Sequence, residues 1–198
     1  VPQVIHSTAS IDRLTELESN AVGDTGTLHP TLRGIRFENV NFRYASGDRQ
    51  ILTGFSHDFQ PGTKTALMGE TGIGKTTLFR LMLGFISPDS GNISLYGSDN
   101  SLTAGAETRP DFVFVPQGNT LMSGTIRFNL QVANPDASDE QLIEALHTAC
   151  ADFVQELPDG LDTLLGERGS GLSEGQAQRI AIARGLLRPG SILLLDEI

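Results

Sequence analysis

The alternation of apolar and polar residues predicts a set of β-strands in the first half of the chain. Between residues 34 and 44, apolar side chains stand at positions 35 and 37 and then at 40, 42 and 44. A period of two residues is typical of a strand with one buried face, and the slip in phase near Glu38 and Asn39 predicts a bulge or two short strands. The same reasoning predicts turns at 46–48 and 60–63, strands over 51–59, 92–96 and 111–115, and a loop over 98–110.

A helical spacing of apolar residues dominates the second half, and residues 118–187 are predicted to be mostly helical. Ser138 begins one helix, with Gln141 three residues later as its capping-box partner. A second helix is predicted over 173–187. Residues 1 to about 19 also have helical spacing, and residues 20–32 are predicted to be a linker. The apolar face of the helix that begins at Ser138 is expected to consist of Leu142, Ile143, Leu146, Ala149 and Phe153.

Two short apolar runs, 65–68 and 191–195, predict buried strands. The first leads into residues 69–76, which have the spacing G-x-x-x-x-G-K-[ST], and a predicted helix follows over 77–83. A glycine-rich loop between a strand and a helix is the context in which this spacing forms a phosphate-binding P-loop. That context disfavours the less specific interpretation, a glycine-rich turn that only opens a helix.

The residue types of the P-loop suit a bound polyphosphate. Glycines let the backbone approach an anion closely, and the start of the helix offers unpaired N–H groups and the positive end of its dipole. Lys75 supplies positive charge for the outer phosphates, and the Thr76 hydroxyl is placed to ligate Mg²⁺. The predicted phosphate-binding residues are Gly69, Glu70, Thr71, Gly72, Ile73, Gly74, Lys75, Thr76 and Thr77.

The second apolar run ends in two acids, Asp196 and Glu197. Parallel α/β sheets gather ligands at the C-terminal ends of their strands, so Asp196 is expected to hold Mg²⁺, directly or through water. Glu197 is expected to polarise the water that attacks the terminal phosphate. Many strands end in a solvated pair of acids, but the P-loop favours the functional interpretation because Mg²⁺ needs ligands from both places.

A third signal precedes the last predicted helix, in the sequence Leu-Ser-Glu-Gly-Gln over residues 172–176. Ser173 is a good N-cap and Gln176 completes its capping box, so a well-capped helix is one sufficient explanation. The other is a second anion site formed by Ser173, Gly175 and the helix end. One nucleotide cannot easily use this end and the P-loop of the same subunit, so that site would require two copies facing head to tail.

Composition narrows the class of protein. The 198 residues carry a formal net charge of −10 and no run of Lys or Arg, which argues against a nucleic-acid-binding protein. Cys150 is the single cysteine, so no internal disulfide and no cysteine metal site is expected. No signal-peptide pattern and no apolar run of bilayer-spanning length is found, so if this protein serves a membrane, the spanning part is expected outside this chain.

The motifs, in this order, resemble the nucleotide-binding domain of ABC transporters from about residue 33 to the last residue. The resemblance implies an α/β fold: a P-loop NTPase core with a parallel sheet, an antiparallel β subdomain and a helical subdomain, with the C-terminal part missing. It also implies a division into a leading helix and linker from a transmembrane domain (1–32), an incomplete ATPase core (33–117 and 188–198) and a helical signature subdomain (118–187).

The resemblance assigns further roles. Tyr44 stands where the family stacks an aromatic ring on adenine, and Gln117 where it links Mg²⁺ and the attacking water to the transmembrane partner. Residues 166–169 and 124–129 resemble the exporter versions of their segments. Ser173, Gly175 and Gln176 are expected to bind the nucleotide of an opposing subunit. The implied cofactors are ATP and Mg²⁺, and the implied partners are a second nucleotide-binding domain and the transmembrane domains, at the cytoplasmic face of the membrane.

Two departures from the family pattern set expectations. Glu174 stands where the family usually has glycine, and we expect it to be tolerated because Ser173 and Gly175 are kept. The family continues beyond Ile198 with a partner-facing loop, a core strand and a histidine that contacts the terminal phosphate. That strand inserts between the strands over 65–68 and 191–195, so we expect unpaired strand edges across a gap. We also expect this soluble chain, taken alone, to hydrolyse ATP weakly or not at all.

Two alternatives remain open at this point. A soluble ABC ATPase of DNA repair or translation would share the P-loop and signature, but it would lack the exporter-like loop at 166–169 and the leading helix. A regulatory module that binds ATP without cleaving it is the other alternative. Glu197 argues against it for the intact protein, because degenerate sites typically lose that acid.

Overall fold

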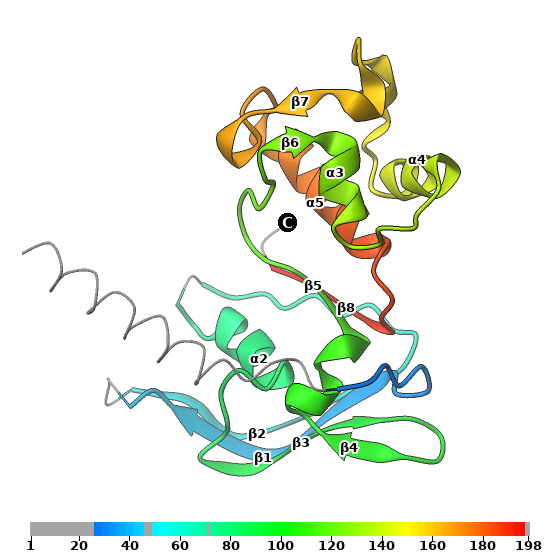
Figure 1. The fold of residues 1–198 in the computed structure, drawn as a ribbon. Helices are drawn as coiled ribbons and strands as arrows, with labels where there is room; N and C mark the ends of the chain where they lie inside the picture. Colours follow the sequence, from blue (N-terminus) through cyan, green and yellow to red (C-terminus); the bar gives the residue numbers. More distant parts are fainter. Residues whose placement is uncertain (1–25, 46–48, 71, 197–198) are drawn as a thin grey trace, which may run out of the picture.

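The computed structural model describes residues 26–45, 49–70 and 72–196. The predicted helix at the chain start, the predicted turn at 46–48, and Thr71, Glu197 and Ile198 lie outside the described residues. Figure 1 shows two parts: an antiparallel sheet with the helix α2 (Lys75–Met82) in the lower half, and a group of helices in the upper half. The strands β5 (Phe112–Val115) and β8 (Ile192–Leu195) run side by side between them.

The lower part is built on a four-stranded antiparallel sheet with the order β2-β1-β3-β4. The register of β1 against β2 shifts between Phe37 and Val40, and Asn39 has a positive φ of 50°. The predicted bulge is therefore confirmed, and it lets apolar side chains on both sides of the slip stay buried. The strands are β1 (Gly34–Arg43), β2 (Gln50–Phe59), β3 (Ser90–Tyr96) and β4 (Ser101–Thr103).

The helix α2 (Lys75–Met82) shares one apolar core with this sheet. Leu81 and Met82 of α2 and Phe37 and Leu95 of the sheet are almost fully buried. The predicted loop over 98–110 was wrong, because it contains β4 and most of the 3-10 helix η1 (Ala106–Asp111). A three-residue strand is too short to show a period, and only its pairing with β3 makes it a strand.

The parallel sheet has two strands, β5 (Phe112–Val115) and β8 (Ile192–Leu195), paired in register from Phe112↔Ile192 to Val115↔Leu195. Both strands were predicted, but β8 is not buried throughout, since Leu193 is 43% exposed. The predicted strand over 65–68 is absent, and Met68 is 91% exposed. A strand must pair its N–H and C=O groups with a neighbour, and no described strand lies alongside this segment.

A cavity of about 860 Å³ lies where such a neighbour would fit. Residues 63–67 line it from one side and residues 191–196 from the other. The two segments thus face each other across the expected gap, but only the second of them forms a strand. The cavity explains why an apolar run that precedes the P-loop remains exposed.

The upper part packs three helices around a second core. Its fully buried members include Leu142 and Leu146 of α4 and Ile180 of α5. Ile143, predicted to be on the apolar face of α4, is 37% exposed, and Ala145 is buried instead. The helices are α3 (Ile126–Gln131), α4 (Asp139–Thr148) and α5 (Glu174–Leu186), accompanied by η2 (Asp152–Glu156), η3 (Gly160–Asp162), η4 (Glu167–Gly169) and the two-residue strands β6 (Gly124–Thr125) and β7 (Leu164–Leu165).

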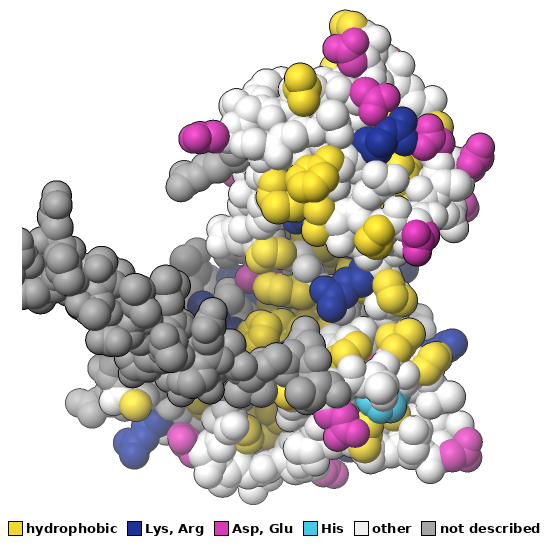
Figure 2. All heavy atoms as spheres, viewed as in Figure 1, with side chains coloured by type: hydrophobic (Ala, Val, Ile, Leu, Met, Phe, Trp, Pro, Cys, Tyr) yellow, Lys and Arg dark blue, Asp and Glu magenta, His cyan; other side chains and the backbone are white. Residues whose placement is uncertain are grey.

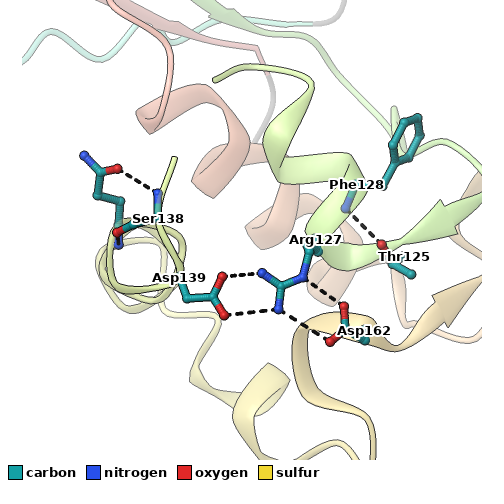
Figure 3. A network of polar contacts seen from close by, with 7 residues as sticks. Thr125, Arg127, Phe128, Ser138, Asp139 and Asp162 are labelled. Carbon is teal, nitrogen blue, oxygen red and sulfur yellow. Dashed lines mark hydrogen bonds and ion pairs between the residues drawn. The ribbon is translucent and has the colours of Figure 1, made fainter. Parts of the chain in front are cut away.

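Polar contacts fix the helices of the upper part. The predicted capping box of α4 is confirmed, because Ser138 Oγ accepts from Gln141 N and Gln141 Oε1 accepts from Ser138 N. Arg127 of α3 reaches Asp139 at the start of α4 and Asp162 in η3, so one guanidinium joins three elements (Figure 3). These two acids raise the pKa of Arg127 above its usual range.

Hydrophobic side chains gather on the surface where the upper and lower parts meet (Figure 2). No helix in the described part of the chain combines the length and the apolar character needed to cross a membrane.

Candidate functional site

The loop before α2 takes backbone conformations that favour glycine. Gly72 has φ of 82° and Gly74 has φ of 118°, a region that side chains with a Cβ rarely adopt. Gly74 is the N-cap of α2 and provides no side-chain oxygen to the helix. The first N–H groups of α2 are therefore left without a side-chain cap, which suits an anionic ligand.

Lys75 lies across its own loop. Its Nζ donates to the carbonyl oxygen of Gly69 at 2.7 Å and to that of Glu70 at 3.2 Å. Carbonyl oxygens are neutral acceptors, so a phosphate oxygen that enters the loop would be a stronger partner for this ammonium group. The lysine is thus held at the loop by contacts that a charged ligand can replace.

Thr76 and Asp196 meet although 120 residues separate them in sequence. Thr76 Oγ1 donates to Asp196 Oδ2 at 3.1 Å, and Asp196 is only 5% exposed. The backbone N–H of Asp196 donates to Val115 O, so pairing with β5 fixes the carboxylate in place. A hydroxyl and a carboxylate oxygen side by side fit a hard cation such as Mg²⁺.

The described residues contain no group of three or more His, Cys, Asp and Glu that could hold a metal. A cation at this site would therefore need other oxygen ligands, such as the Thr76 hydroxyl and phosphate oxygens of a bound nucleotide. Gln117 follows β5 as Asp196 follows β8, and the register Val115↔Leu195 places both residues beyond the same edge of the parallel pair. Gln117 is exposed there.

Tyr44 lies against α2 at Thr77, the residue directly after the P-loop motif. Its hydroxyl is 3.0 Å from Thr77 Oγ1, and Arg80 Nη1 donates to it at 3.4 Å. The ring meets Phe42 edge to face, with centroids 5.0 Å apart. The structure thus brings together Tyr44, the loop, Thr76 and Asp196 around one end of α2.

The predicted nucleotide-binding residues at the start of α5 lie away from the P-loop. Ser173 Oγ accepts from Gln176 N at 3.2 Å, and Gln176 Oε1 accepts from Ser173 N at 2.9 Å, so the capping box of α5 is formed. Ser173 and Gly175 are exposed at the helix start. Figure 1 places α5 in the upper part and α2 in the lower part, so the structure does not bring these residues to the P-loop. The segment 166–169 contains η4, and Gly166 and Glu167 are exposed.

Two polar contacts at the two ends of β5 had no signal in the sequence. Arg184 of α5 donates to the carbonyl and the hydroxyl oxygen of Thr120, three residues after Gln117. Burial lowers the pKa of the Arg184 guanidinium. Asp111 directly precedes β5 and is fully buried. Its carboxylate accepts a hydrogen bond from the backbone N–H of His29 and pairs with Nδ1 of the same histidine. Each contact spans 64 residues or more, so neither partner could be read from local spacing.

Comparison with known proteins gives one consistent result. The sequence profile of the ABC transporter family matches residues 52–198. The mycobactin import ATP-binding/permease protein IrtB of Mycobacterium tuberculosis is 40% identical over 164 residues, which cover 82% of this chain and 28% of that protein. P-glycoprotein 14 of Caenorhabditis elegans is 38% identical over 190 residues, which cover 95% of this chain and 14% of that protein.

Solved structures point the same way. A bacterial Atm1-family ABC exporter with ATP bound superimposes with a TM-score of 0.78 at 32% identity, and the match covers 99% of this chain and 35% of that one. The chain thus spans between 14% and 35% of the length of these three proteins. It belongs to the ABC transporter family and carries an ATP-binding domain of the exporter type.

Proposed function

We propose that this domain binds ATP with Mg²⁺ at the P-loop, hydrolyses it, and so drives transport by membrane-spanning domains of the same transporter. Lys75 and the N–H groups of the loop hold the phosphates, and Thr76, Gln117 and Asp196 serve Mg²⁺. Glu197, outside the described residues, positions the attacking water. When bound, Mg²⁺ supplies positive charge to the phosphate oxygens. Phosphoryl transfer depends mainly on positioning and charge stabilisation, which this set of residues can provide.

The observation that carries this proposal is the hydrogen bond from Thr76 to Asp196. It supports a single cation site shared by the P-loop and the end of β8, because each contributes one oxygen ligand there. A P-loop that merely opened a helix would have no reason to place its threonine against a buried carboxylate.

The exposed start of α5 supports a partner. We propose that Ser173, Gly175 and Gln176 contact the nucleotide of a second, head-to-tail copy of the domain, and that the pair works at the cytoplasmic face of the membrane. Closure of the pair on ATP and its release after hydrolysis would move the membrane domains. Among the similar proteins one is named for import and another is an exporter, so the direction of transport and the cargo belong to the membrane domains.

Titration with ATP in the presence and absence of Mg²⁺ tests the site. Lys75→Ala should weaken ATP binding at least about tenfold under both conditions, because it removes a phosphate contact. Asp196→Asn should keep the Mg²⁺-free affinity and lose most of the gain that Mg²⁺ provides. Asp136→Asn, an exposed acid in the loop before α4, is the control and should behave like the wild type. Unchanged affinity in Lys75→Ala would contradict the assignment of the site.

A further inference from the structure

The ring expected to meet the base is held by the same helix that carries the phosphate ligands. Tyr44 follows β1, and its hydroxyl lies 3.0 Å from Thr77 Oγ1. Arg80, on the same face of α2 three residues later, donates to that hydroxyl at 3.4 Å. Arginine can only donate, so the tyrosine oxygen accepts from Arg80 and its own proton is free for Thr77. Both hydrogen-bonding roles of the hydroxyl are therefore filled from α2.

The ring is also fixed at its other end. The edge-to-face contact with Phe42 has an interplanar angle of 84°, and Phe42 and Thr77 are both buried. Two buried neighbours on different elements thus set the position of the ring, while Arg80 closes the network from the exposed side. Three consecutive residues of α2 have different partners: Lys75 its own loop, Thr76 the end of β8, and Thr77 the end of β1.

We infer that Thr77 and Arg80 are positioning residues for the nucleobase, which act by fixing the Tyr44 ring relative to the P-loop. The inference rests on the proposed function, because it assumes that the base stacks on Tyr44. A ring that is already held in place loses no further freedom when the base binds. Affinity for ATP then depends on the Tyr44 hydroxyl as well as on the ring, whereas affinity for a ligand without a base does not.

Binding of MgATP and of magnesium tripolyphosphate, which has the phosphates but no base, separates the two contributions. Tyr44→Phe keeps the ring and removes the hydroxyl, and Arg80→Gln removes one of its anchors. Each should weaken MgATP binding about three- to tenfold, as the loss of one or two hydrogen bonds predicts. Each should leave tripolyphosphate binding unchanged. The double variant should lose little more than Tyr44→Phe alone, because both changes remove the same contact.

Arg43→Gln is the matched control. Arg43 carries the same charge one residue before Tyr44 and is exposed, and side chains alternate along a strand, so its removal should leave both affinities unchanged. Wild-type affinity for MgATP in Tyr44→Phe would overturn the inference, as would an equal loss for both ligands, which a purely structural contact predicts. An equal loss in Arg43→Gln would overturn the role of Arg80. If the wild type bound neither ligand, the proposed function itself would fail.

Discussion

The helical part of this molecule encloses its apolar side chains more completely than the parallel-sheet part does. Leu142, Leu146 and Ile180 are fully buried among the helices. In contrast, Met68 in the segment before the P-loop is 91% exposed and Leu193 in β8 is 43% exposed. A helix forms its backbone hydrogen bonds within its own segment, whereas a strand needs a neighbour. The sequence of a helix therefore predicts more of its structure than the sequence of a strand does.

The two apolar runs of the parallel-sheet part illustrate this directly. Residues 192–195 form a strand because β5 pairs with them on one side. Residues 65–68 have a similar pattern and form none, and a cavity of about 860 Å³ separates the two segments. The two segments differ in their available partner: residues 192–195 pair with β5, and no described strand pairs with residues 65–68.

Truncation of one leucine in each part should give the largest difference in the free energy of unfolding. Leu146→Ala removes a fully buried side chain from the helical core and should lower the free energy of unfolding by about 2–5 kcal/mol. Leu193→Ala removes a side chain that already meets solvent and should cost less than about 1 kcal/mol. Denaturant unfolding of the two purified variants measures both values. Equal losses of stability in the two variants would mean that β8 is buried in solution, and would contradict the difference between the two parts.

The two capping boxes test whether the local sequence signals that predict the helices also stabilise them. Ser138→Ala and Ser173→Ala each remove a side-chain acceptor from a helix start, and each should cost about 1 kcal/mol of stability. The two variants should differ in ATP hydrolysis, because only Ser173 is proposed to contact a nucleotide. A steady-state ATPase assay of the intact transporter should therefore detect a loss in Ser173→Ala alone. A similar loss in Ser138→Ala would assign the effect to helix stability.

The contacts of the candidate site also differ in whether the local sequence predicts them. The sequence predicted that Thr76 and Asp196 would meet, because the P-loop and the end of a parallel strand each have a strong local pattern. It did not predict that Arg80 reaches Tyr44, that Arg184 holds Thr120 or that His29 pairs with Asp111. Those contacts join residues 36, 64 and 82 positions apart, and each depends on which elements pack together. The catalytic and binding roles of the site residues remain predictions.

One residue of the helical part departs from the local rules. Cys150 has a φ of 56° at the end of α4, where its N–H donates to His147 O and the N–H of Ala151 donates to Leu146 O. This is the Schellman pattern, whose left-handed position favours glycine. Cys150→Gly should therefore raise the free energy of unfolding, by about 0.5–1 kcal/mol. Thermal unfolding of the variant checks the sign, and a lower midpoint would show that the thiol contributes more than the strain removes.

The smallest expected effect concerns the contact that joins three elements of the helical part. The hydrogen bond from Arg127 holds the pKa of the Asp162 carboxyl below its ordinary value of 3.8. A carboxyl whose folded pKa is lowered stabilises the fold above its unfolded pKa, and this contribution disappears as the pH falls through the folded pKa. Asp162→Asn should thus lower the unfolding midpoint slightly at pH 7, and the difference from the wild type should disappear as the pH falls below 3.8 and through the lowered folded pKa.

A pH series of unfolding midpoints for the wild type, Asp162→Asn and the exposed-loop control Asp136→Asn measures this difference. Because Asp162 is well exposed to solvent, added salt should also reduce the difference at pH 7. A difference that persists unchanged at low pH would assign it to packing rather than to charge. In that case the apolar core and the helix caps stabilise the helical part without a contribution from this ion pair. The contrast with the parallel-sheet part would then depend on backbone pairing alone.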